Sequence, residues 1–282
     1  MKVSGFTFIR NAIQYDFPIV EAVRSVLPIV DEFVVNVGQS DDDTLGLIQS
    51  IGSEKVRIVE SVWDDSLRKD GKIFGIQQDL ALSYCTGDWA LLVQGDEVLH
   101  EDDYPVIRKA IYKYCDNPEV LGLVFRMVHF KGDYWSVDPW MYRKATRIVR
   151  NYCGIHSTTD CCDFMAPGVS RMLKGEKSSR LIKARVFHYG WVKDQKVLQE
   201  KLRFQYSRHD GDRLSDGEIS HLAAMRAEYQ NYDVLKDYYG THPKVMQSRV
   251  QPSIRLRPRR NRWLNTKFYQ DCLLYTSDAA DE

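Results

Sequence analysis

The chain has 282 residues, of which 44% are hydrophobic and 28% charged, an ordinary composition for a soluble globular protein. Lysine plus arginine and aspartate plus glutamate both total 39, so no net charge argues for nucleic acid or a membrane surface as partner. The N-terminus lacks the apolar run of a signal peptide, and no stretch approaches the roughly 20 apolar residues of a membrane span.

Cysteine spacing argues against a structural zinc site. The six cysteines include no CxxC pair, and the adjacent Cys161 and Cys162 have poor geometry for bonding to each other. Reduced thiols in a cytoplasmic protein are the simplest interpretation.

The first half of the chain alternates short apolar runs with amphipathic segments. Asp16 is the predicted N-cap of the first helix, and Gly87 is the predicted stop of the third. This β-α-β-α-β-α-β order, with strands apolar on both faces, predicts a parallel sheet with right-handed crossovers. The predicted strands are 3–9, 33–37, 56–60 and 89–93, and the predicted helices are 17–28, 44–51 and 72–85.

The second half has a different pattern. A helix capped by Asp102 or Asp103, with Pro105 in its first turn, comes before three predicted strands, and Asp194 can cap a further helix. We therefore expect an α/β fold whose parallel, Rossmann-like first half leads into a mixed second half, with residues 1–245 forming one domain. The three strands are predicted at 121–130, 145–151 and 180–190.

Two C-terminal segments are set apart from the domain. Residues 246–271 are expected to be an extended basic segment, and the run "RLRPRRNRW" within it either contacts phosphates or is simply solvated. Residues 272–282, "CLLYTSDAADE", resemble translated sequencing-adapter read-through, so we treat them as a non-native tail.

Polar loops follow three of the predicted parallel strands. In open α/β sheets, ligands bind outside the carboxyl ends of the strands. The loops are Arg10-Asn11-Ala12, residues 38–44 and Gln94-Gly95-Asp96-Glu97, so one rim should collect an arginine and several carboxylates. Neither GxGxxG nor GxxxxGK[ST] occurs in the chain, which argues against a dinucleotide oxidoreductase and a P-loop enzyme.

Asp96 and Glu97 are adjacent acids at the end of an apolar strand, where unpaired charge is costly. One interpretation is that Asp96 binds a divalent cation together with a diphosphate, because Mg²⁺ and Mn²⁺ favour oxygen ligands and often take only one or two protein carboxylates. The alternative is structural: the two acids cap the next helix and pair with lysine or arginine.

Several segments, in order, resemble family 2-type glycosyltransferases of the GT-A fold. The resemblance covers roughly residues 3–210. The metal motif of these enzymes is usually Asp-x-Asp (DxD), and this chain resembles the subset in which the motif is Gln-x-Asp-Glu. The matching segments are "FIRNA", "SDDDT", "ALSYCTGDWALLVQGDEV", "HFKGDYW", "RIVRN", "IHSTTD" and "VFHYGWVKD".

The resemblance implies a metal and nucleotide site. Asp96 and His188 would bind Mn²⁺ or Mg²⁺, and the nucleotide-sugar residues would be Arg10, Asn11, Asp42, Gln77, Gln94 and Asp96. The chain departs from the pattern at Gln94, which cannot supply a charge, and at Val37-Gly38-Gln39, where many members have Asp-Asp-Gly. The alternative for His188 is packing among its aromatic neighbours.

The resemblance also points to an acceptor side. Inverting transfer needs one carboxylate to take the proton of the acceptor hydroxyl. Asp160 is the first choice for this base, with Asp163 and His156 as alternatives, although all three also suit ordinary turns. Trp135, Trp140 and Tyr142 either form an acceptor platform or pack in the core or a lid.

The sequence thus predicts a glycosyltransferase of the hexosyltransferase type, acting in glycan biosynthesis. It would move a sugar from a nucleoside-diphosphate donor to a hydroxyl of a glycan, a lipid-linked or a small-molecule acceptor, by inversion and with Mg²⁺ or Mn²⁺. The alternatives are an inactive nucleotide-sugar-binding module and a sugar-phosphate nucleotidyltransferase. We expect a cytoplasmic protein with no nucleic-acid partner and no transmembrane segment, and we leave peripheral membrane contact open.

Overall fold

A computed structural model describes residues 1–67, 69–169, 171–211, 213–228 and 235–250 of the chain. Short 3-10 helices occur at Leu27–Ile29, Glu101–Asp103, Leu173–Gly175 and Lys244–Met246. The other elements, in chain order, are β1 (Val3–Ile9), α1 (Ile19–Val26), β2 (Glu32–Gly38), α2 (Thr44–Gln49), β3 (Val56–Ser61), α3 (Lys72–Ser83), β4 (Trp89–Leu92), β5 (Glu97–Leu99), α4 (Tyr104–Tyr114), β6 (Gly122–Lys131), β7 (Ser136–Val137), β8 (Lys144–Arg150), β9 (His156–Ser157), β10 (Phe164–Met165), β11 (Ser179–Trp191), α5 (Gln195–His209), α6 (Asp216–Glu228) and β12 (Lys236–Asp237).

The main sheet has the predicted change of character along the chain. Strands β3, β2, β1 and β4 lie side by side, and every pair among them is parallel. β8 then pairs antiparallel with both β4 and β6, while β11 runs parallel to β6 and antiparallel to β5. The predicted fold class, with a parallel first half and a mixed second half, is confirmed.

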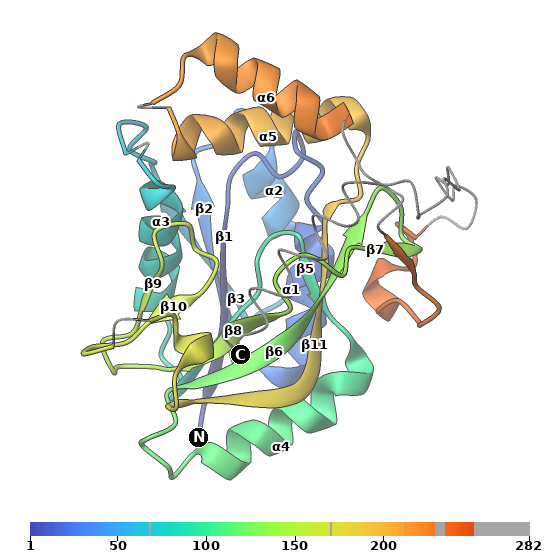
Figure 1. Cartoon of the computed structure of the whole chain (residues 1–282). Coiled ribbons are helices and arrows are strands. Elements are labelled where there is room, and N and C mark those ends of the chain that lie inside the picture. The colour runs from blue at the N-terminus through green and yellow to red at the C-terminus, as the bar shows by residue number, and fades with distance from the viewer. Residues whose placement is uncertain (68, 170, 212, 229–234, 251–282) are drawn as a thin grey trace.

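Alternate residues of each buried strand pack on opposite faces of the sheet, as the pleat requires. Leu91 belongs to the hydrophobic cluster that includes α1 and α4. Its neighbours Ala90 and Leu92 belong to the cluster that includes Ala81 and Leu82 of α3. Figure 1 shows α5 and α6 together at the end of the molecule towards which β1 runs, and α4 at the opposite end. Because an apolar cluster covers each face of the sheet, the sequences of the parallel strands are continuous apolar runs.

One predicted helix cap is wrong and a second is confirmed in position only, because both side chains bond to distant residues. The first residue before α1 is Pro18, with no side-chain cap, and the carboxylate of Asp16 pairs with Arg249 at 2.7 Å. Asp103 precedes α4 as predicted, but its carboxylate accepts hydrogen bonds from Arg185 rather than from the helix. The cap at Asp194 is confirmed, since its carboxylate accepts a hydrogen bond from the backbone nitrogen of Lys196.

Gly87 does not end α3 by a left-handed turn. The residue that follows α3 is Tyr84, and Gly87 is not among the residues with positive φ. A Cβ at position 87 would lie 2.7 Å from the backbone nitrogen of Ser4, so glycine is needed there for close approach to β1.

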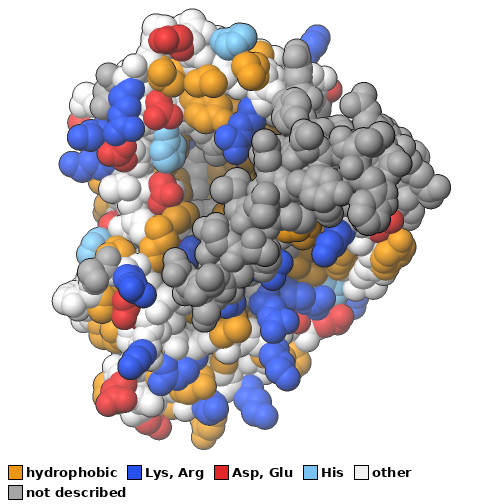
Figure 2. Space-filling model, viewed as in Figure 1, with side chains coloured by type: hydrophobic (Ala, Val, Ile, Leu, Met, Phe, Trp, Pro, Cys, Tyr) orange, Lys and Arg blue, Asp and Glu red, His pale blue; other side chains and the backbone are white. Residues whose placement is uncertain are grey.

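Some features lie beyond what the pattern predicted. The strands β5, β7, β9, β10 and β12 have only two or three residues each, and α6 was not predicted. The predicted basic segment 246–271 lies mostly, and the tail 272–282 wholly, outside the described residues. The five cysteines among the described residues form no disulfide. None of the described helices combines the length and apolarity needed to cross a membrane. On the face in Figure 2, acidic and basic side chains are interspersed, in keeping with the zero formal charge.

Candidate functional site

A cavity of about 260 Å³ lies beyond the carboxyl ends of β1 and β4. Phe8, Ile9 and Arg10 line it from β1 and the residue that follows, and Gln94, Gly95 and Asp96 line it from the loop after β4. Helix α5 forms another wall with Lys201, Phe204, Gln205 and His209. This is the edge of the sheet at which the sequence predicted a site.

Asp96 is held in the cavity by its backbone and by a buried lysine. Its carbonyl accepts a hydrogen bond from the backbone nitrogen of Tyr189, and its Oδ2 lies 2.8 Å from Nζ of Lys201. Burial would raise the pKa of Asp96, but the charge of Lys201 and its hydrogen bond outweigh it and hold that pKa well below its usual range. Gly190 allows this approach, because a Cβ there would lie 2.5 Å from Oδ2 of Asp96.

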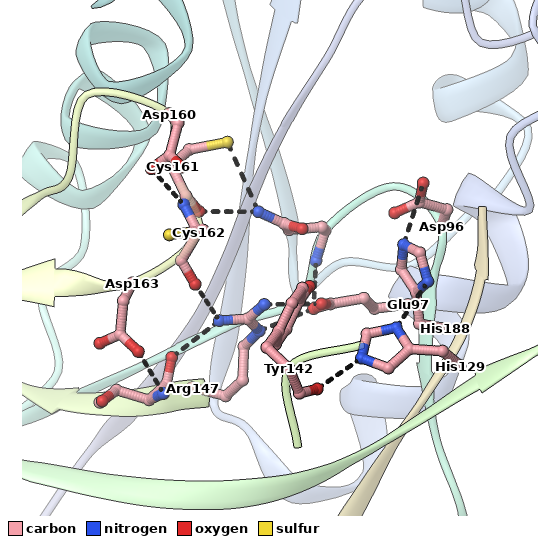
Figure 3. A network of polar contacts seen from close by, with 12 residues as sticks. Asp96, Glu97, His129, Tyr142, Arg147, Asp160, Cys161, Cys162, Asp163 and His188 are labelled. Atoms are coloured by element: carbon pink, nitrogen blue, oxygen red, sulfur yellow. Dashed lines mark hydrogen bonds and ion pairs between the residues drawn. The ribbon is translucent and has the colours of Figure 1, made fainter. Parts of the chain in front are cut away.

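His188 faces Asp96 with a defined tautomer. Its Nδ1 lies 3.1 Å from Nδ1 of His129, and Nε2 of His129 lies 2.7 Å from the carbonyl oxygen of Tyr142. Burial lowers the pKa of both histidines, that of His188 to about 3, so both are neutral at physiological pH. A carbonyl only accepts, so His129 carries its proton on Nε2, and His188 donates from Nδ1 to His129. The unprotonated Nε2 of His188 then faces Oδ2 of Asp96 at 3.6 Å (Figure 3).

Glu97 has a different partner and lies outside the cavity lining. Its carboxylate takes two hydrogen bonds from the guanidinium of Arg147, at 2.8 and 2.7 Å, and neither side chain reaches solvent. Arg147 also donates to the carbonyl of Cys162. The two adjacent acids are thus each paired with a basic side chain, as the structural interpretation expected, but neither caps a helix.

The three candidate bases occupy different environments. Asp160 lines the cavity and accepts hydrogen bonds from Thr158 and from the backbone nitrogen of Cys162. Burial would raise the pKa of Asp160, but these hydrogen bonds outweigh it and lower the pKa. Asp163 is fully buried, accepts from two backbone nitrogens and does not line the cavity. His156 is exposed on β9 and also lies outside the lining.

Gln94 connects the strand end to the Asp160 loop. Its side-chain nitrogen donates to the carbonyl oxygen of Cys161 at 2.8 Å. In Figure 3, Asp96 and His188 lie on one side of the view and Asp160 on the other, with Tyr142 between them. The site therefore has one acid on each side, Asp96 and Asp160. Asp96 is held by Lys201, and the Asp160 loop is held by the hydrogen bond from Gln94.

The other predicted nucleotide residues are divided. Arg10 lines the cavity, stacks over Trp63 and lies 3.4 Å from Asp65. Asn11 and Asp42 lie outside the lining and brace the loops after β1 and β2: the side-chain nitrogen of Asn11 donates to Asp41, and Asp42 accepts from the backbone of Gln14.

Gln77 is buried between the sheet and α3, where its side-chain oxygen accepts from Asn36 and Ser61. It does not line the cavity either. The nucleotide-binding roles of Asn11, Asp42 and Gln77 stay predictions, and any such role would have to act through the loops and strands they support.

An aromatic wall was not expected from the sequence. Trp63 lies 6.0, 5.9 and 6.2 Å, between ring centroids, from Phe8, Phe74 and Phe204, and all four line the cavity. Of the three aromatics singled out in the sequence, Tyr142 lines the cavity, whereas Trp135 and Trp140 do not. The wall comes from four separated segments, which is why no local motif indicated it.

The donor atoms on the Asp96 side suit a divalent cation in part. A carboxylate oxygen and an unprotonated imidazole nitrogen converge there, and His129 fixes the orientation of that imidazole. However, Lys201 donates to the same oxygen of Asp96 that faces His188, so a metal ion held by that oxygen and by His188 would compete with the ammonium group. Among the described residues, a cluster of three donors occurs only at His100, Glu101 and Asp102, outside the cavity lining.

Lys201 is a further site residue that the sequence analysis missed. It lies on the apolar stripe of α5, three residues after Leu198 and next to Leu202, and all three side chains are buried. A lysine on the core-facing stripe of a helix is a signal that could have been found, because such a charge needs a buried partner.

Comparison with known proteins gives distant matches. No family model matches the chain. An uncharacterised glycosyltransferase of Rickettsia prowazekii is 24% identical over 151 residues, which are 54% of this chain and 46% of that protein. One of Rickettsia felis is 31% identical over 101 residues, 36% of this chain and 31% of that protein. The chain thus spans about half or less of the length of these relatives, whose names agree with the enzyme class that its motifs resemble.

Solved structures give equally distant likenesses. TarS of S. aureus in complex with UDP is 16% identical with a TM-score of 0.43, over 80% of this chain and 70% of that one. Glucosyl-3-phosphoglycerate synthase from Mycobacterium tuberculosis, in complex with Mg²⁺ and UDP, is 16% identical with a TM-score of 0.32, over 45% of this chain and 43% of that one. Likenesses at this level do not decide a substrate or a cofactor.

Proposed function

We propose that the chain is a glycosyltransferase that moves a sugar from a nucleoside-diphosphate donor to an acceptor hydroxyl, with residues 1–245 as its catalytic domain. The observation that carries this proposal is one cavity, at the carboxyl ends of parallel strands, with Asp96, paired with Lys201, on one side and a second acid, Asp160, on the other. The names of the curated relatives support the enzyme class.

The diphosphate of the donor belongs on the Asp96 side in this proposal. Mn²⁺ or Mg²⁺, when bound, would be held by Asp96 and His188 and would supply positive charge to the leaving diphosphate. Arg10 and Gln94 remain our proposed contacts to the nucleotide sugar. The aromatic wall around Trp63 offers flat apolar surface for a base or a sugar ring.

Asp160 is our proposed catalytic base. The acceptor hydroxyl gives its proton to the Asp160 carboxylate while its oxygen bonds to the anomeric carbon, and the bond from that carbon to the diphosphate oxygen breaks. A displacement from the side opposite the leaving group inverts the anomeric centre. The Asp160 carboxylate is ionised at neutral pH, as a proton acceptor must be, and the hydrogen bonds that lower its pKa also make it a weaker base than a free aspartate.

Donor turnover tests the proposal. The purified protein is incubated with UDP-, GDP-, ADP- and CDP-linked sugars, and slow hydrolysis is measured as release of the free nucleoside diphosphate. Asp96→Asn should abolish hydrolysis while the protein remains folded, and Asp160→Asn should reduce transfer but leave nucleotide affinity unchanged. Unchanged turnover in Asp96→Asn would remove the site from the reaction. Nucleotide binding without any turnover would instead favour the inactive binding module, which the neutral Gln94 makes a real second candidate.

A further inference from the structure

Lys201 is a buried ammonium group at the centre of the candidate site. Its side chain is 5% exposed, and it reaches the cavity from α5. It donates to Oδ2 of Asp96 at 2.8 Å and to the carbonyl oxygen of Gly190 at 3.0 Å. An ammonium group has three N–H donors, so one remains without a hydrogen-bond acceptor among the described residues.

The charges around Lys201 suit a phosphate better than a second cation. Gln94, where many similar enzymes have an aspartate, is neutral and donates its side-chain hydrogen bond to Cys161. A second lysine, Lys193, approaches the same Phe17 ring that Lys201 approaches, at 5.1 and 5.0 Å from the ring centroid. Burial lowers the pKa of Lys193 to about 7, so Lys201 is the lasting positive charge beside Asp96. That buried ammonium group can attract a diphosphate.

We propose that Lys201 is a built-in cation that lets this site bind a nucleoside diphosphate without a divalent metal. Its free N–H donates to a diphosphate oxygen, while its other two bonds keep it on Asp96 and Gly190. This inference rests on the proposed function and gives its donor site a specific chemistry.

The same geometry makes Lys201 and a metal ion alternatives. Both would use Oδ2 of Asp96, and a dication beside an ammonium group within hydrogen-bonding distance of the shared oxygen is strongly repelled. The proposal therefore predicts a reciprocal pattern: removing the lysine weakens metal-free binding and frees Asp96 and His188 for metal.

Isothermal titration calorimetry with UDP, GDP, ADP and CDP tests this pattern in EDTA and in Mn²⁺. The wild-type chain should bind its preferred diphosphate in EDTA. In EDTA, Lys201→Met should weaken that binding on the order of tenfold to a hundredfold, the value of one charge-assisted hydrogen bond. Mn²⁺ should restore it. Lys196→Met, an exposed charge change on the same helix, is the matched control and should change neither measurement.

The possible results separate this inference from the proposed function. If the wild-type chain binds a diphosphate only with Mn²⁺, or Lys201→Met binds normally in EDTA, the inference is wrong and the proposed function stands. If no diphosphate binds in either buffer, both fail. Should Lys201→Met not fold because Asp96 is left unpaired, the double variant Asp96→Asn/Lys201→Met removes both charges. It should bind no diphosphate in EDTA, and tight binding by it would overturn the inference.

Discussion

The buried Glu97–Arg147 pair gives the sharpest test of what holds the site together. Both side chains are fully buried, and two charge-assisted hydrogen bonds join them. Arg147→Met leaves the Glu97 carboxylate in the interior without a cation, and breaking such a pair costs about 3–5 kcal/mol. This is a large part of a total stability of about 5–15 kcal/mol. For a domain of this size we expect the melting temperature to fall by roughly 10 °C.

Urea denaturation followed by circular dichroism measures this loss. The matched control is Arg185→Met, because Arg185 also pairs with an aspartate but is 38% exposed, and we expect that substitution to cost about 1 kcal/mol. Replacing both partners, as Arg147→Met with Glu97→Leu, should recover most of the loss, since no buried charge is left. If Arg147→Met loses no more stability than Arg185→Met, the pair does not carry the energy assigned to it.

Three further predictions concern the site and its surroundings. Gly190→Ala places a Cβ 2.5 Å from Oδ2 of Asp96 and should abolish nucleotide binding in calorimetry, whereas Gly175→Ala, where a Cβ meets nothing within 4 Å, should not; equal affinities would refute the crowding argument. Burial alone would raise the pKa of Glu32, but hydrogen bonds to its carboxylate outweigh it and lower the pKa from 4.5 to about 2. Its stabilisation is therefore complete above pH 4.5 and is lost as the pH falls towards 2, so the difference in unfolding free energy between wild type and Glu32→Gln should shrink over that range; a constant difference would contradict this. Burial raises the pKa of Cys162 to about 11, so its alkylation by iodoacetamide at pH 8, followed by mass spectrometry, should be much slower than that of free cysteine, and an equal rate would disprove the shielding.

The sequence predicted the fold well because hydrophobic period and strand order are local signals. The apolar runs at 3–9, 33–37 and 89–93 became parallel strands, and the predicted helix at 72–85 became α3. Caps failed where tertiary contacts competed: Asp16 and Asp103 bind Arg249 and Arg185 instead of helix ends. Strands of two or three residues leave no periodic pattern to detect.

The site was predicted only in part, because its members come from distant segments. Asp96, His188 and Asp160 were found through motif order, and all three line the cavity. The pairing of Asp96 with Lys201 joins residues 105 positions apart, and nothing in the local sequence around either residue specifies it. The aromatic wall likewise joins side chains from separate segments, so no single motif contains it.

That separation has a consequence for the nascent polypeptide. At about 5–20 residues per second, the ribosome adds Lys201 roughly 5 to 20 s after Asp96. The early strands can assemble in that interval, while Asp96, in the loop after β4, is still hydrated and not yet paired with Lys201. The docking of α5 would then be a late event that completes the pocket and desolvates both groups together, so a partly synthesised chain would have a sheet before it had a binding site.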